Sequence, residues 1–323
     1  MVEISVIVPV YNAERFLKRC LDALVSQTFK NLEIIVIEDC SEDNTKIILD
    51  EFQNKYEGKV RIIYNQRNKG VSASRNEGIL SAQGKYLVFC DADDWYEKDA
   101  VELMYNSITE HKADFLISNY YLNKDSQKMP RDIVSQYNVE VPSRKQIVKY
   151  MDLSSCGKMI SRELLKNNNL LYPMDLKRCE EYQVIPVAAY LADKVVCLNR
   201  YTYHYYQNKG SASNKKEEDL SFFDISFDRY CSYIDKEKYK AEIEYRAREH
   251  LLYGKVLSML KYGQTFAAIK QCINIFEKDY TDCYDKDVLR DYPLSRKVFF
   301  QFVKRRWMIG LKALAFIHTL SIS

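Results

Sequence analysis

The sequence predicts an α/β protein that is followed by a helical C-terminal region. Over the first 120 residues, short runs rich in Val and Ile alternate with segments of helical pattern, and the connections between them are short. This alternation is typical of right-handed βαβ units and a parallel sheet. From about residue 217 the pattern is helical to the end. We therefore expect an α/β domain over residues 1–215 and a helical region over 216–323.

The expected strands and helices of the first half follow one another in regular order. The strands are Ile4–Val8, Glu33–Glu38, Val60–Asn65, Tyr86–Cys90 and Asp114–Tyr120, and the helices are Ala13–Ser26, Asp43–Tyr56, Ser72–Ala82 and Lys98–His111. Ligands of a parallel sheet bind beyond the carboxyl ends of its strands. The segments after the first four strands should therefore converge on one crevice, and they are Pro9–Asn12, Asp39–Ser41, Asn65–Gly70 and Asp91–Asp94.

The pattern weakens between residues 121 and 143, where we expect a polar connection. Helices are then expected at Arg144–Met151, Arg162–Asn168 and Glu180–Ala192, and strands at Lys194–Leu198 and Thr202–Tyr206. The predicted boundary lies near residues 210–216. Beyond it the expected helices are Glu217–Ile234, Glu237–Tyr262, Gln264–Lys278 and Leu294–Leu320.

The composition, with 47% hydrophobic and 29% charged residues, is that of a folded protein. The nine Cys are scattered without a CxxC pair. This favours free buried thiols in a reducing compartment over a zinc knuckle or a disulfide framework. The N-terminus opens directly into an apolar run, and no signal peptide is evident. A cytoplasmic protein is expected.

The net charge of +3 conceals an asymmetry, because residues 296–323 hold six basic side chains and no acidic one. A basic amphipathic helix is expected over this segment, and its apolar side would hold Phe299, Phe302, Val303, Ile309, Phe316, Ile317 and Leu320. Such a helix could bind an anionic membrane surface, pack on the protein's own core or join two subunits. It is too short to span a bilayer. No nucleic-acid partner is expected, since no recognisable binding module is present.

Three carboxylates follow the fourth expected strand, at Asp91, Asp93 and Asp94. Like charges this close repel one another and need a partner. Hard cations such as Mg²⁺ take oxygen ligands, commonly one or two carboxylates together with substrate phosphates. The pattern therefore indicates either a metal site that holds a phosphorylated substrate or a solvated acidic turn.

Other polar residues have a functional and a structural interpretation each. Asp39 could accept a hydrogen bond from a nucleobase or cap a turn. Arg75 lies one turn into a helix, where the N-terminus and the guanidinium both favour phosphate. Glu180 and Glu181 could supply a general base or complement a helix dipole. His204, in an aromatic strand, is a core residue or a ligand.

Taken together and in this order, these pieces resemble the family 2 glycosyltransferases. The resemblance covers roughly residues 1–215 and runs through Ser5–Asn12, Glu38–Asp43, Asn68–Gly70, Ser74–Gly78, Asp91–Asp94, Gly157–Ile160, Glu180–Glu181, Tyr203–Tyr205 and Ser211–Ser213. It implies a GT-A fold, a Rossmann-like mixed sheet flanked by helices. The nucleotide half would span about 1–120 and the acceptor half about 121–215. It also implies glycosyl transfer from a nucleotide sugar, usually a UDP-sugar, with inversion.

The resemblance implies roles for single residues. In the donor pocket, Pro9, Tyr11 and Glu14 would line the nucleoside, Asp39 would bind uracil, Arg75 would contact the nucleotide or its phosphates, and Asp91 and Ala92 would face the sugar nucleotide. Asp93 would ligate Mn²⁺ or Mg²⁺, with Asp91 and His204 as further candidate ligands. Glu181 would be the general base beside Glu180. Arg75 or Lys209 would assist the leaving diphosphate, and Lys158 matches a basic position ahead of the acceptor segment.

Two positions depart from the family's pattern. The motif that usually reads Asp-Asp-Gly-Ser is here Glu38-Asp39-Cys40-Ser41, so a turn glycine is missing. The base motif usually reads Glu-Asp and is here Glu180-Glu181. The side chain of Glu181 is therefore one methylene longer than that of the usual Asp.

The expected function is transfer of a sugar from a UDP-sugar to a hydroxyl of a glycan or lipid-linked acceptor in surface polysaccharide synthesis. Residues 295–323 could hold the enzyme on the inner face of the cell membrane, and the C-terminal helices could form a homo-oligomer. The alternatives are a nucleotidyltransferase and a non-catalytic, sugar-nucleotide-binding assembly module.

Overall fold

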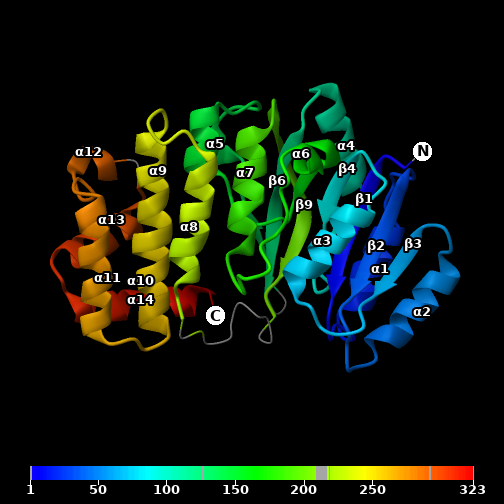
Figure 1. Ribbon diagram of the computed structural model, residues 1–323, viewed down its shortest axis with the longest axis horizontal. Coiled ribbons are helices and arrows are strands. Elements are labelled where there is room, and N and C mark those ends of the chain that lie inside the picture. Colours follow the sequence, from blue (N-terminus) through cyan, green and yellow to red (C-terminus); the bar gives the residue numbers. More distant parts are fainter. Residues whose placement is uncertain (1, 125–126, 209–216, 218, 291, 323) are drawn as a thin grey trace. The chain divides into compact units, whose positions relative to one another are not determined.

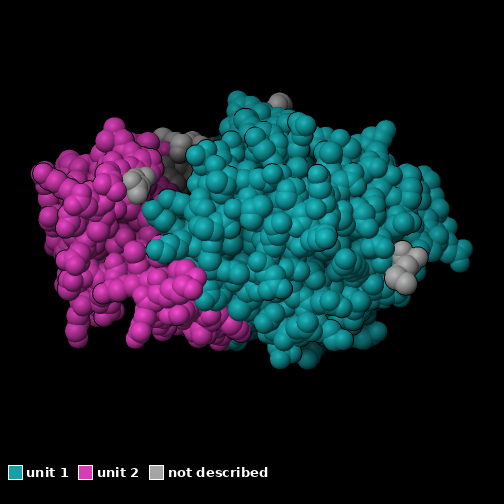
Figure 2. All heavy atoms as spheres, turned by 90° about the horizontal axis from the view of Figure 1, so that it is seen from above, with its two compact units in different colours: residues 1–214 teal, residues 215–323 magenta. Residues whose placement is uncertain are grey.

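The structure, a computed structural model, describes residues 2–124, 127–208, 217, 219–290 and 292–322. The chain divides into two units, Met1–Asn214 and Lys215–Ser323, which are coloured teal and magenta in Figure 2. Unit 1 holds the sheet and unit 2 is helical (Figure 1).

The described part of unit 1 is built on a mixed sheet with the strand order β3-β2-β1-β4-β8-β6-β9-β5, and β7 pairs with β6. The parallel strands of the first half are β1 (Ile4–Val10), β2 (Leu32–Glu38), β3 (Val60–Tyr64) and β4 (Tyr86–Phe89). The second half adds β5 (Trp95–Tyr96), β6 (Phe115–Lys124), β7 (Gln127–Arg131), β8 (Lys158–Ser161) and β9 (Val195–Tyr206). β8 runs antiparallel to β4 and β6, whereas β6 and β9 are parallel. The expected α/β fold with a mixed sheet is confirmed.

Helices cover both faces of β1 and β2, which are buried along their whole length. Val6, Val8 and Ile34 share a core with α1 (Leu17–Val25) and α2 (Thr45–Lys55). On the other face, α3 (Val71–Ser81) approaches β1 and β2 so closely that a Cβ at Gly78 would lie 2.4 Å from Ile7 Cγ2. The helix α4 (Ala100–Glu110) packs on β6 and β9.

The second half of unit 1 differs from the expectation in several ways, among them the strand β8, which was not expected. The polar connection expected from residue 121 is a hairpin, in which β6 continues to Lys124 and pairs with β7. The two short strands expected between 194 and 206 are one strand, β9, because a register shift opposite Asn119 absorbs the polar residues at its middle. The helix expected from Glu180 begins as the 3₁₀ helix η2 (Glu180–Gln183), and α7 (Ile185–Leu191) follows with Pro in its first turn.

The short helices of this half are η1 (Ser135–Tyr137), α5 (Arg144–Tyr150) and α6 (Arg162–Asn167). Unit 2 holds α8 (Phe222–Tyr233), α9 (Lys240–Ala247), the π-helix η4 (Arg248–Gly254), α10 (Lys255–Lys261), α11 (Phe266–Asp279), α12 (Lys286–Leu289), α13 (Leu294–Lys304) and α14 (Met308–Ile322). The helix expected over Glu237–Tyr262 is thus α9, η4 and α10 in succession. Of the helices that the structure describes, none is both long and apolar enough to cross a bilayer.

The single helix expected from Leu294 is two helices, α13 and α14. The break falls at Arg306, whose φ of 54° lies in the left-handed region. The N–H groups of Arg306 and Trp307 donate to Val303 and Phe302, which closes the end of α13. The Arg306 guanidinium is held by the Glu277 carboxylate and, at 2.8 Å, by the Asn274 side chain. A tertiary contact with α11 therefore ends the helix, and the local sequence pattern does not show it.

Candidate active site

The candidate site lies where the strand order of the sheet reverses, between β1 and β4. The strands β2 and β3 extend from one side of β1, whereas β4 lies on the other side. In α/β sheets, such a switch point opens a crevice at the carboxyl ends of the strands. The segments after β1 and β4 both reach this edge, and the second of them carries Asp91, Asp93 and Asp94.

Arg75, in the first turns of α3, joins three acidic residues from two separate segments. Its guanidinium lies 3.0 Å from Asp91 Oδ1, 2.9 Å from Glu180 Oε1 and 3.8 Å from Glu181 Oε1. The Arg75 side chain is only 5% exposed. Burial acts to lower its pKa, but the carboxylates, Asp91 foremost, raise it well above the usual value. Arg75 is therefore the counter-charge that holds the acids of the two halves together.

Glu181 has the properties of a general base. Burial raises the pKa of its carboxyl to about 7; Arg75 lowers it, whereas Glu180 and Asp91 raise it further. The Ser155 N–H donates to Glu181 Oε1 at 2.8 Å, and the Ser155 hydroxyl donates to the same oxygen. A base with a pKa near 7 is half ionised at neutral pH and can accept a proton there.

The three acids after β4 have different environments. Asp94 is fully buried, and its two oxygens accept hydrogen bonds from the Tyr203 hydroxyl at 2.6 Å and the Tyr206 N–H at 2.7 Å. Burial raises the pKa of Asp94 well above its usual value. Burial and the neighbouring Asp91 raise the pKa of Asp93 to about 6. Asp91 is partly open, with 34% of its side chain exposed.

These environments decide which residues fit a metal ion. Single ligand atoms of Asp91, Asp94 and Cys156 lie within 4.8 Å of one another. Asp94 already accepts two hydrogen bonds, and burial raises the pKa of the Cys156 thiol well above its usual value, which disfavours the thiolate. Asp91 and Asp93, both only partly buried, offer the hard oxygen ligands that Mn²⁺ or Mg²⁺ would take.

Asp39 is buried and organises a loop. Its carboxylate accepts hydrogen bonds from the Asn65 side chain at 2.8 Å, the Lys69 N–H at 2.9 Å and the Gly70 N–H at 2.8 Å. It thereby fixes the segment that leads into α3 and Arg75. In the turn after β2, Cys40 has a φ of 62°, at the position where the family's pattern usually has Gly. The buried Glu38 carboxylate stabilises that turn by accepting from the N–H groups of Cys40 and Ser41.

The loop after β1 is fastened to the loop after β2. The Asn12 N–H donates to Ser41 Oγ at 3.0 Å, and Glu14 Oε2 accepts from the N–H of Asn44 at 3.0 Å. Glu14 thus ties the two loops together. Pro9 is buried within β1, whereas Tyr11, directly after this strand, is 47% exposed. Ala92 is buried in the turn after β4.

His204 has partners other than the carboxylates of the site. Its Nε2 lies 2.8 Å from Glu97 Oε1, its Nδ1 lies 3.1 Å from the Asn123 side chain, and its ring stacks on Trp95. Burial lowers its pKa, against the opposing effect of Glu97. Both ring nitrogens of His204 thus have protein partners.

Of the two remaining basic residues implied by the family pattern, the structure describes only Lys158. Lys158 is fully buried on β8 and pairs with Asp152 at 2.8 Å. Lys209 and the segment 211–213 lie outside the described residues. Sequence reasoning gave no role to Ser155 or Tyr203, because a single hydroxyl side chain forms no recognisable pattern.

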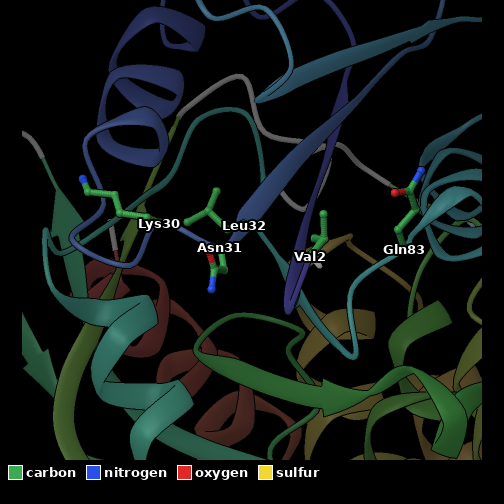
Figure 3. Close-up of a pocket in the computed structure, with 5 residues that line it drawn as sticks. All are labelled: Val2, Lys30, Asn31, Leu32 and Gln83. Carbon is green, nitrogen blue, oxygen red and sulfur yellow. The ribbon is translucent and has the colours of Figure 1, made fainter.

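A hollow of about 440 Å³ lies elsewhere on unit 1, and Figure 3 shows its lining. Val2 and Leu32 place it at the amino ends of β1 and β2, opposite the candidate site. Its other lining residues are Lys30, Asn31 and Gln83. It contains none of the acids described above and is not a candidate for the reaction.

The sequence of residues 5–168 matches the protein-family model described as glycosyl transferase family 2. Glycosyltransferase GlyA of Streptococcus pneumoniae is 35% identical over 226 residues, which are 65% of this chain and 31% of GlyA. Glycosyltransferase GlyG of the same organism is 26% identical over 94% of this chain and 97% of GlyG. The chain thus spans about a third of GlyA but nearly all of GlyG.

The crystal structure of Staphylococcus aureus TarS residues 1–349 with UDP-GlcNAc is similar in fold. It has a TM-score of 0.73 and 20% identity, and the match covers 99% of this chain and 92% of that one. The full name of TarS is poly(ribitol-phosphate) beta-N-acetylglucosaminyltransferase. Its sequence is 30% identical to this chain over 208 residues, which are 64% of this chain and 35% of TarS. The similarity extends over the helices after the sheet as well as over the sheet.

Proposed function

The chain belongs to glycosyl transferase family 2, and from this premise we propose that it transfers a sugar from a UDP-sugar to an acceptor hydroxyl with inversion. The observation that carries the proposal is Glu181. A carboxyl with a pKa of about 7 lies beside Arg75 and Asp91, at the edge of the sheet where nucleotides bind in this type of fold.

The proposed reaction is a single displacement. The acceptor oxygen attacks the anomeric carbon, the bond from that carbon to the diphosphate oxygen breaks, and its electron pair leaves with UDP. Glu181 takes the proton of the attacking hydroxyl. Attack from the face opposite the leaving group inverts the anomeric carbon, so one base suffices. Arg75 keeps Asp91 and the Glu180–Glu181 pair in place during this step.

We propose that Asp93 and Asp91 hold Mn²⁺ or Mg²⁺. When bound, such an ion would offset the negative charge that develops on the diphosphate. Tyr11, Glu14, Pro9, Asp39 and Ala92 would form the nucleoside side of the site. The exposed ring of Tyr11 and the buried, loop-fixing carboxylate of Asp39 support different parts of this wall.

The proposed acceptor is a hydroxyl of a glycan or lipid-linked precursor of a surface polysaccharide. The name of TarS includes a poly(ribitol-phosphate) acceptor, which is one polymer of this general class. The support for this chain is the likeness to TarS in sequence and fold.

A donor screen tests the proposal. UDP release and sugar transfer are measured with a panel of UDP-sugars for the wild type, Asp93→Ala and Glu181→Gln. We expect transfer by the wild type, loss of metal-dependent turnover in Asp93→Ala, and loss of turnover with retained UDP binding in Glu181→Gln. Full activity of Asp93→Ala would refute the metal site. Pyrophosphate release would indicate a nucleotidyltransferase, and tight binding without turnover on any acceptor would indicate an assembly module.

We also propose that α13 and α14 bind an anionic membrane surface at the inner face of the cell membrane. Phe299 and Val303 are buried, but Ile309, Phe316 and Ile317 on α14 are 72%, 66% and 59% exposed. The exposed Trp307 lies between the helices. Basic residues of this segment, with no acid among residues 296–323, suit anionic lipid.

Phe316→Glu should reduce sedimentation with anionic liposomes while UDP binding persists. Ile275→Glu, at an exposed apolar position on α11, is the matched control and should sediment like the wild type. If Phe316→Glu instead dissociates an oligomer in the absence of liposomes, the exposed face of α14 joins subunits and the membrane proposal is wrong.

A further inference from the structure

Ser155, which is in none of the motifs that the sequence analysis identified, holds the Glu181 carboxylate. Its N–H and its hydroxyl both donate to Glu181 Oε1. Both hydrogen bonds go to the same oxygen, and the Arg75 guanidinium lies 3.8 Å from that oxygen. Ser155 thus fixes one oxygen of the carboxylate and donates no hydrogen bond to the other.

The direction of the hydroxyl hydrogen bonds follows from the proton count. Ser155 has one hydroxyl proton, and the carboxylate of Glu181 can only accept it when ionised. The Tyr172 hydroxyl, 2.8 Å from Ser155 Oγ, must then donate to Ser155. Tyr172 is itself fixed by Asn76, whose side chain exchanges two hydrogen bonds of 2.8 Å with the Tyr172 backbone. Both Ser155 and Tyr172 are buried.

The loop that presents Ser155 is fixed on its far side. The buried Lys158 ammonium binds Asp152 at 2.8 Å and the Cys156 carbonyl at 3.1 Å, which closes the loop on itself. The Ser118 N–H and hydroxyl donate to the Gly157 carbonyl at 2.9 and 2.8 Å. The two donors of Ser155 therefore stand on a rigid support, as a residue that orients a base requires.

We propose that Ser155 is the positioning residue of the base Glu181, a role that rests on the proposed function. Glu181 is one methylene longer than the usual Asp and has one more rotatable bond. Two hydrogen bonds to Oε1 restrict that freedom and hold the carboxylate in one orientation. The charged groups that face this carboxylate are Arg75 from α3, Glu180 from η2 and Asp91 after β4.

The test compares Ser155→Ala with Ser154→Ala. In the wild type the Ser154 hydroxyl accepts a hydrogen bond from the Cys156 N–H and makes none to Glu181. The first readout needs no activity. The Glu181 carboxyl is titrated by ¹³C NMR in protein labelled at the glutamate carboxyl carbon, with Glu181→Gln to assign the signal. Ser155→Ala should raise the pKa of Glu181, because a hydrogen bond to the charged form is lost. Ser154→Ala should leave it unchanged.

The second readout is kinetic. In Ser155→Ala, kcat at pH 7 should fall about tenfold, with the acid limb of its pH profile moved to higher pH and the donor KM unchanged. Tyr172→Phe, which keeps both Ser155 donors, should move the limb in the same direction by less. Identical Glu181 titrations in Ser155→Ala, Ser154→Ala and the wild type would overturn the proposal. If the wild type transfers no sugar, the proposed function fails, and the titration still decides whether Ser155 holds Glu181.

Discussion

Glu181→Gln should make the protein more stable at alkaline pH while it removes the proposed base. An unfolded glutamate has a pKa near 4.5, and the folded value of Glu181 is about 7. Between these values the folded protein binds more protons than the unfolded chain, so stability falls as pH rises. The difference between the two pKa values corresponds to about 3 kcal/mol in full, most of which is lost between pH 5 and pH 8.

The assay is chemical denaturation at pH 5, 6, 7 and 8, with the difference in unfolding free energy between Glu181→Gln and the wild type plotted against pH. This difference removes the contributions of groups that titrate alike in both proteins. Glu51→Gln, at an exposed position on α2, is the control for a glutamate outside the site. The difference for Glu181→Gln should rise by about 3 kcal/mol from pH 5 to pH 8. A flat line for Glu181→Gln would refute the raised pKa and, with it, the main support for this base.

Four further outcomes are expected. The wild-type kcat should rise about tenfold from pH 6 to pH 8, because the ionised fraction of a group with a pKa of about 7 grows from roughly 0.1 to 0.9; a pH-independent kcat would exclude Glu181 as the base. Arg75→Met should cost about 3 kcal/mol of unfolding free energy at pH 8 and less at pH 6, where Glu181 takes up a proton; denaturation at both pH values checks this. Cys40→Gly should stabilise the fold by about 0.5 kcal/mol, since a left-handed residue loses its Cβ clash; a lower melting temperature would contradict it. Lys158→Met should cost about 2 kcal/mol by denaturation, because the Asp152 carboxylate loses its partner but keeps some solvent.

The strands of the nucleotide half could be predicted because their sequences are locally decisive. β1 and β2 are rich in Val and Ile, and both are buried along their whole length. β8 was not predicted, since Lys158–Ser161 is short and begins with a charge that only its buried partner Asp152 compensates. The β6–β7 hairpin was missed for a similar reason, because its second strand contains Lys128 and Pro130 and is largely exposed.

The candidate site was predictable as a set of residues but not as an arrangement. The rule that strand ends converge, together with the family-like order of motifs, indicated Asp91, Arg75 and the Glu180–Glu181 pair. It did not indicate that Arg75 would face protein carboxylates, because that depends on how α3 and η2 meet across the crevice. Ser155 had no signal at all, since its role comes from the loop between Asp152 and Lys158.

The reciprocal bonds between the loops after β1 and β2 have a consequence for how this wall of the crevice can change. Asn12 Oδ1 accepts from the Glu42 N–H while the Asn12 N–H donates to Ser41 Oγ. Glu14 Oε2 accepts from the N–H and the side-chain amide of Asn44, while the Glu14 N–H donates to Asp43 Oδ2. A substitution on one loop therefore removes a partner from the other. The two loops are therefore expected to change together, so that altering the proposed nucleoside side of the site would need substitutions on both. Double-mutant cycles between residues of the two loops should be strongly non-additive.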